Sequence, residues 1–264
     1  MITKVYLFPT IFTAANMFCG FWSIVLSING KFVPASWLII LGIIFDGIDG
    51  LIARSKNISS TIGAELDSLA DFITFCIAPI VLVWQLVGYR YSFSGIMVCF
   101  LYVFFGALRL AKFNVFSLYK ERNEKITFYE GLPTPASAGI IVSIILLLSI
   151  SSGWSGITKR HLTFLIAIAP ILENFLPAFI LVLSLLMITK LRYPKMNNIG
   201  LTKKVSLKVL TIVIITVLLI FSYPESSVFL IFSAYILYGI IEYFVRLYKM
   251  RKAKKHYNVD ENRT

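Results

Sequence analysis

Residues 45–72 of the chain read FDGIDGLIARSKNISSTIGAELDSLADF, and this stretch places four aspartates inside strongly apolar sequence. The four are Asp46, Asp49, Asp67 and Asp71. An ionised carboxylate within a bilayer is costly, so such residues are rare and usually functional. Four of them in two close pairs favour a bound cation, and we therefore predict a metal site inside the membrane-spanning part of the chain.

The composition is typical of a membrane protein. Of the 264 residues, 58% are hydrophobic and only 14% are charged, whereas soluble domains average about 25% charged residues. The apolar residues form blocks of about 18–25 residues, each long enough to cross a hydrocarbon core of roughly 30 Å. We predict an all-α fold, a polytopic transmembrane helical bundle of about eight spans. The predicted spans are 7–28, 35–54, 63–88, 93–111, 135–152, 171–189, 205–222 and 228–247.

The sixth span is the least regular, because Pro170, Glu173 and Pro177 interrupt it. Residues 161–190 form either one broken helix or an interfacial piece followed by a span. The three cysteines are an odd number and lie in apolar sequence, which predicts no disulfide framework.

The basic residues predict the orientation of the chain. With eight spans, all of the 25 lysines and arginines except Lys31, Arg90, Lys159 and Arg160 fall on one side. Since basic loops remain in the cytoplasm, we expect both termini and the opening of the aspartate hairpin on the cytoplasmic side. The expected location is a bacterial-type cytoplasmic (inner) membrane.

The polybasic segment 246–255 has two interpretations, which are compatible. It anchors the last helix, or it attracts anionic lipid headgroups, at about 1 kcal/mol per basic residue near the surface. We expect no nucleic-acid partner.

The spacing of the aspartates predicts their convergence. Spans two and three form a helical hairpin around the loop 55–62, with Asp49 and Asp67 about 6–8 Å deep and Asp46 and Asp71 about 12 Å deep. Each pair is spaced i,i+3 or i,i+4 and shares one helix face, so the four can converge on one cavity. Oxygen ligands without His or Cys favour Mg²⁺, Mn²⁺ or Ca²⁺ over zinc. Four carboxylates suffice for two divalent ions, which suits phosphate chemistry.

Several residues near the four aspartates have both a packing and a binding interpretation. Gly50 and Gly63 either allow close helix packing or leave room for a nucleotide. Arg54 is either a helix end that snorkels or a phosphate contact. Thr13 and Asn16 are polar residues in an apolar helix, for which hydrogen bonding between helices is the default.

The spacing D-x2-D-G-x2-A-R-x8-G-x3-D-x3-D from Asp46 to Asp71 resembles that of the CDP-alcohol phosphotransferases, membrane enzymes of phospholipid synthesis. The resemblance implies that the four aspartates hold two divalent cations, Mg²⁺ or Mn²⁺ with Ca²⁺ as another occupant, against the CDP diphosphate. It implies that Asp71 is the catalytic base and that the enzyme is a homodimer. The CDP pocket would comprise Thr13, Asn16, Gly50, Ala53, Arg54 and Gly63.

Further stretches at 16–24, 63–79, 106–115, 128–139 and 186–194 resemble the bacterial type of phosphatidylserine synthase within this family. The implied substrates are CDP-diacylglycerol and L-serine. Arg109 and Lys112, i,i+3 on one face, either hold the serine carboxylate or anchor their helix, and Asn114 is placed with them as a candidate for acceptor binding. Lys112 stands where the family pattern has arginine. We divide the chain into a core at 1–195, two additional spans at 196–248 and a basic tail at 249–264.

Two other functions stay open at this point. Within the family, the acceptor alcohol is instead that of a phosphatidylglycerophosphate, phosphatidylinositol or phosphatidylcholine synthase. Outside it, an acidic site in a membrane fits a divalent-cation transporter. Against a transporter, the carboxylates lie near one face and no matching motif occurs in the second half of the chain.

Overall fold

The computed structural model describes residues 7–56, 61–120, 128–151, 163–189, 192–194 and 222–261. Within these residues, six helices are long and apolar enough to cross a membrane, and a shorter apolar helix covers residues 134–149. The prediction of an all-α, polytopic bundle is confirmed. The predicted span 205–222 lies outside the described residues except for its last position. Five of the six lie in α1 (Leu7–Ile28), α2 (Phe32–Lys56), α5 (Ser92–Lys120), α7 (Thr163–Ile188) and α9 (Pro224–Glu261). The sixth covers residues 62–86, and the shorter apolar helix is α6 (Thr134–Ser151).

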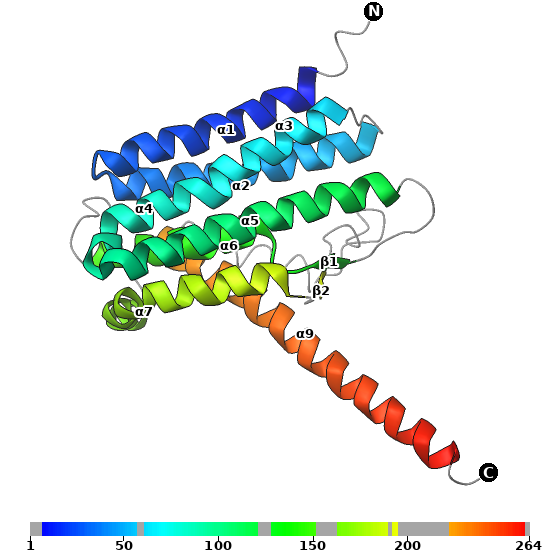
Figure 1. The fold of residues 1–264 in the computed structure, drawn as a ribbon. Coiled ribbons are helices and arrows are strands. Elements are labelled where there is room, and N and C mark those ends of the chain that lie inside the picture. The colour runs from blue at the N-terminus through cyan, green and yellow to red at the C-terminus, as the bar shows by residue number, and fades with distance from the viewer. Residues whose placement is uncertain are drawn as a thin grey trace, which may run out of the picture.

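A tight turn lays α2 antiparallel against α1, and the two helices run side by side in Figure 1. Gly30 adopts a left-handed φ of 73°, which glycine tolerates without steric cost. The turn is closed by bonds from the Gly30 N–H to the Ser27 carbonyl (3.0 Å) and from the Lys31 N–H to the Leu26 carbonyl (2.9 Å). This pattern is the usual glycine end of a helix.

The third span is one apolar run in the sequence but three segments in the structure. It consists of α3 (Thr61–Asp71), the π-helix η1 (Phe72–Ile77) and α4 (Ala78–Leu86). Pro79, at the start of α4, has no N–H and so cannot donate to the carbonyl of Phe75 four residues earlier. The Tyr102 hydroxyl of α5 donates to that carbonyl instead, over 3.2 Å. The 3-10 helix η2 (Gly88–Tyr91) then leads into α5.

The sixth predicted span is a single continuous helix. α7 begins at Thr163, eight residues before the predicted start, and contains both Pro170 and Pro177. Figure 1 shows its first turns nearly end-on and the rest running across the view, so the helix bends. Prolines are a common cause of such bends, and membrane helices tolerate them because neighbouring groups satisfy the freed carbonyls.

Two short strands were not predicted. β1 (Phe128–Glu130) pairs antiparallel with β2 (Arg192–Pro194), with Tyr129 opposite Tyr193. Beside β1, Gly131 has a φ of 81°, and a Cβ there would clash with the Met187 carbonyl oxygen. The pair therefore joins the segment before α6 to the end of α7. It lies at the end of the bundle where α2 ends and α3 begins (Figure 1).

The core of the bundle surrounds α6, whose isoleucines and leucines from Ile140 to Leu148 are almost fully buried. The last helix, α9, packs against α6 and crosses the other helices diagonally, and its C-terminal half extends beyond them (Figure 1). It continues without a break from the predicted span 228–247 into the predicted tail, as far as Glu261. The division of the chain at 195 and 248 stays a prediction.

Candidate metal centre

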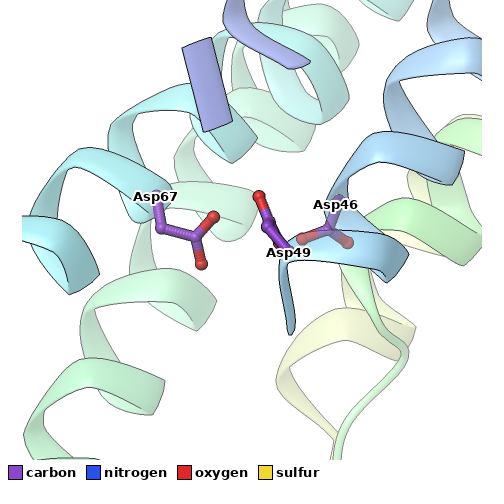
Figure 2. A group of neighbouring side chains, drawn as sticks. All are labelled: Asp46, Asp49 and Asp67. Carbon is purple, nitrogen blue, oxygen red and sulfur yellow. The ribbon is translucent and has the colours of Figure 1, made fainter. Parts of the chain in front are cut away.

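Three carboxylates from two helices gather beside α1. Asp46 and Asp49 extend from α2, and Asp67 extends from α3 toward them (Figure 2). One carboxylate oxygen from each lies within 4.8 Å of the others. Asp49 is buried, with 4% of its surface exposed, and the other two are half-buried. Asp49 and Asp67 lie six to seven residues from their helix ends, a depth of about 9–10 Å.

Helix α1 closes one side of this group through its two polar residues. Thr13 is buried, and its hydroxyl donates to Asp49 Oδ2 over 3.3 Å. Asn16 is fully buried, and its Nδ2 donates to Asp71 Oδ1 over 3.1 Å. The Thr74 hydroxyl in turn donates to the backbone carbonyl of Asn16 over 2.9 Å. These bonds agree with the expectation of hydrogen bonds between helices.

The fourth aspartate, Asp71, lies one helical turn beyond Asp67, at the last residue of α3. It is not among the three residues whose oxygens lie within 4.8 Å of one another. Its carboxylate nevertheless accepts a bond from Asn16, one turn along α1 from Thr13, which bonds to Asp49 of the cluster. The structure therefore brings the four aspartates into one region, with three clustered and the fourth fixed by Asn16.

The cluster suits a divalent cation. Three carboxylates of like charge share a small volume, which is costly without a cation to neutralise them. In addition, Asp67 Oδ1 is buried and has no hydrogen-bond partner among the described residues. A donor set made of oxygen alone fits Mg²⁺, Mn²⁺ or Ca²⁺. The centre is thus chemically able to hold a metal ion, and the assignment of each ligand stays a prediction.

The glycines of α2 differ in what surrounds them. A Cβ at Gly42 would lie 2.7 Å from Thr74 Cγ2 and 3.0 Å from Asn16 Oδ1, so this glycine allows α2 to approach the Asn16 side chain. A Cβ at Gly47, next to Asp46, would meet nothing within 4 Å. Of the predicted CDP-binding residues, Gly50 lies in α2 and Gly63 in α3. Ala53 and Arg54 lie in the last turns of α2, and their side chains fall outside the described part.

Arg109 and Asn114, two of the three candidate acceptor residues in the second half of α5, make separate contacts. Arg109 Nη1 donates to the Thr134 hydroxyl of α6 over 2.9 Å. Asn114 accepts a bond from the Ser68 hydroxyl (2.9 Å) and donates to Glu65 (3.3 Å), both in α3. Lys112 is exposed. Ser68 and Thr134 lie within the stretches 63–79 and 128–139 quoted above, but their pairing with α5 has no signal in the sequence.

Comparison with known proteins identifies the class. Residues 6–172 match the model of the CDP-alcohol phosphatidyltransferase family, and the chain belongs to this family. With its apolar helices, it is an integral membrane protein. Family membership favours an enzyme over a cation transporter, in agreement with the resemblance in the aspartate motif.

Curated relatives extend the similarity beyond the family domain. A CDP-diacylglycerol–serine O-phosphatidyltransferase of Helicobacter pylori (strain 26695) is 34% identical over 249 residues, which cover 94% of this chain and 96% of the relative. A Bacillus subtilis (strain 168) protein of the same name is 34% identical over 51% of this chain and 72% of its own length. An archaetidylserine synthase of Methanothermobacter thermautotrophicus is 31% identical over 75% of this chain and 74% of its own length.

Proposed function

We propose that this chain transfers the phosphatidyl group of CDP-diacylglycerol to L-serine, giving phosphatidylserine and CMP. The observation that carries the proposal is the similarity to the Helicobacter pylori serine O-phosphatidyltransferase along almost the whole of both chains. The carboxylate cluster in α2 and α3 supports it, because phosphoryl transfer to an alcohol uses divalent cations beside the diphosphate.

In this proposal Asp46, Asp49, Asp67 and Asp71 hold two divalent cations, Mg²⁺ or Mn²⁺, with Ca²⁺ as another occupant. When bound, the cations neutralise and align the diphosphate. Asp71 accepts the proton of the serine hydroxyl, and Asn16 fixes the orientation of its carboxylate. The serine oxygen bonds to the phosphorus that carries diacylglycerol. The bond from this phosphorus to the bridging oxygen breaks, and CMP leaves with that oxygen.

The remaining site residues are assigned to the two substrates. Thr13, Asn16, Gly50, Ala53, Arg54 and Gly63 bind CDP, with the Arg54 guanidinium suited to a phosphate. Arg109, Lys112 and Asn114 bind serine. Arg109 is the principal candidate for the serine carboxylate, because a guanidinium forms two parallel hydrogen bonds with a carboxylate. The Thr134 hydroxyl holds it by one nitrogen, which orients the group.

The proposed setting is a bacterial inner membrane, with the site and both termini facing the cytoplasm. The basic residues of the loops support this orientation. We further propose a homodimer, and contact of the basic segment 246–255 with anionic lipid. An intramembrane site near one face suits a donor that has lipid tails and a polar head.

The acceptor is tested with purified protein, labelled CDP-diacylglycerol and MgCl₂. Serine, glycerol 3-phosphate, inositol and choline are offered in parallel, and CMP release and the lipid product are measured. We expect CMP release that depends on serine alone, with phosphatidylserine as product. Release that depends on another alcohol would refute serine as the acceptor.

The role of Asp71 is tested in the same assay. Asp71→Asn is expected to abolish product formation while CDP-diacylglycerol still binds, because the amide cannot accept the hydroxyl proton. Glu173→Gln is a matched control, since this carboxylate pairs with Arg90 of η2, at the opposite end of the third span from the aspartates. Near-normal turnover of Asp71→Asn would rule out Asp71 as the base.

A further inference from the structure

The π-helix η1 begins at the residue that follows Asp71. Such segments are rare, and they occur often at functional sites. In η1 the N–H of Ala78 bonds to the carbonyl of Ile73, five residues earlier, instead of four. The extra residue rotates the rest of the span by about 100° relative to a continuous α-helix. The register of η1 therefore determines which way α3 presents Asp67 and Asp71 when α4 is packed in the core.

Two hydrogen bonds from neighbouring residues fit this register. The Thr74 hydroxyl of η1 donates to the carbonyl of Asn16, the residue that bonds to Asp71. On the other side, the Tyr102 hydroxyl donates to the carbonyl of Phe75 over 3.2 Å. That carbonyl receives no N–H from Pro79, so the tyrosine supplies the donor that the proline lacks.

Tyr102 is closely packed against its neighbours. The side chain is fully buried, and it is one of the largest fully buried side chains of the described residues. One turn later in α5, a Cβ at Gly106 would lie 2.5 Å from Cys76 Sγ, so the glycine allows α5 to approach η1 closely. Arg109 lies seven residues after Tyr102, on the same face, and contacts Thr134. Tyr102 and Gly106, which contact η1, therefore lie on the same face of α5 as Arg109, the proposed acceptor residue.

We infer that Tyr102 is a positioning residue for the transfer reaction: its hydroxyl fixes the π-helical register of η1 through the Phe75 carbonyl, and this register places the Asp71 carboxylate. The inference rests on the proposed function, in which Asp71 is the base. Tyr102 itself contacts no substrate in this account. Its removal should therefore slow the chemical step without weakening substrate binding.

The test is Tyr102→Phe, which removes the hydroxyl and keeps the ring. Because a buried carbonyl is left without its donor, we expect kcat to fall about ten- to a hundredfold, with both KM values within about twofold of wild type. Tyr91→Phe is the matched control, since the hydroxyl of Tyr91, in η2, also donates to a backbone carbonyl, that of Asn174 in α7 (3.1 Å). It should leave kcat unchanged. A folded Tyr102→Phe variant with wild-type kcat would overturn the inference.

A double-mutant cycle tests the route through the carbonyl. Pro79→Ala restores an N–H that can reach the Phe75 carbonyl in the α-helical pattern. When Tyr102→Phe is added to Pro79→Ala, kcat should fall by about threefold or less relative to Pro79→Ala alone. The yield of folded protein should likewise fall by about threefold or less. Equal losses in the two backgrounds would show that the hydroxyl does not act through this carbonyl. The cycle also applies if Tyr102→Phe alone folds poorly, because the double variant should then recover.

Failure of the proposed function is recognised separately, with Asp71→Asn in the same experiment. If Asp71→Asn retains turnover, the assignment of the base fails. If Asp71→Asn is inactive and Tyr102→Phe is normal, only the positioning role of Tyr102 fails. If serine is not the acceptor, the same cycle is measured with the alcohol that releases CMP.

Discussion

Replacing Asn16 by alanine removes the amide that donates to Asp71 Oδ1 over 3.1 Å. Asn16 is fully buried, in close contact with α2 at Gly42, and its backbone carbonyl accepts the bond from Thr74. The substitution leaves this backbone bond in place and removes only the side-chain contact. Asn16→Ala therefore tests whether the orientation of the Asp71 carboxylate depends on the bond from Asn16.

The expected loss in kcat for Asn16→Ala follows from the type of hydrogen bond that is removed. Hydrogen bonds to charged groups contribute about 1.5–3 kcal/mol, roughly twice the value for neutral pairs. A loss of about 2 kcal/mol, felt in the transition state, lowers kcat about thirtyfold. Asn16→Asp should be more damaging, because it adds a carboxylate next to Asp71. At about 3 Å and an effective dielectric constant of about 20, that repulsion is on the order of 5 kcal/mol.

The assay is CMP release from CDP-diacylglycerol in detergent, with serine and donor varied separately. The control is Asn29→Ala at the other end of α1, where an exposed asparagine amide donates to the Val25 carbonyl over 2.8 Å. We expect Asn29→Ala to retain wild-type kinetics. For Asn16→Ala we expect a lower kcat with little change in the KM for serine.

Two results would contradict this reasoning. If a folded Asn16→Ala variant has a kcat within about threefold of wild type, the bond to Asp71 does not matter for the chemical step. If the substitution instead raises the KM for CDP-diacylglycerol and leaves kcat unchanged, Asn16 acts only on the nucleotide. Such a result would retain Asn16 in the CDP pocket and remove it from the positioning of the base.

Two further predictions concern the metal centre and the packing beside it. Asp67→Asn should raise the Mg²⁺ concentration needed for half-maximal CMP release at least about tenfold, because it removes a charged ligand, whereas Glu173→Gln should leave the metal titration unchanged. An unaltered titration in Asp67→Asn would exclude Asp67 as a ligand. Gly42→Ala should destabilise the protein by about 1–3 kcal/mol in thermal unfolding, because its methyl group would lie 2.7 Å from Thr74 Cγ2. Gly47→Ala, with open space within 4 Å, should unfold like wild type, and equal effects of the two substitutions would refute the packing argument.

The apolar helices were predictable because composition and length determine them. The predicted span 7–28 coincides with α1, and the four aspartates of the predicted hairpin fall on α2 and α3. The proximity of Asp46, Asp49 and Asp67 also follows from helical spacing and from equal distances to a short loop. These features depend on local periodicity, which a single sequence contains.

The π-helix was not predictable, since its register depends on a contact with Tyr102, 27 residues away from Phe75. Pro79 inside an apolar span was the local signal, but a proline alone does not distinguish a kink from a π-helix. The contacts of Asn114 were also not predictable from the sequence. Its amide bonds to Ser68 and Glu65, and only the packing of α5 on α3 identifies those partners.

The strand pair also sets the order in which the protein can be completed during synthesis. β1 ends at Glu130, but its partner β2 ends only at Pro194, roughly 65 residues after the start of β1. At about 5–20 residues per second, the ribosome needs about 3–13 seconds to make the intervening chain. Throughout that interval α1, α2 and α3 have already been synthesised, so the aspartates can assemble before β1 has a partner. The aspartate hairpin therefore precedes the pairing of β1 with β2, and a stall between α6 and α7 would leave the hairpin assembled without that strand pair.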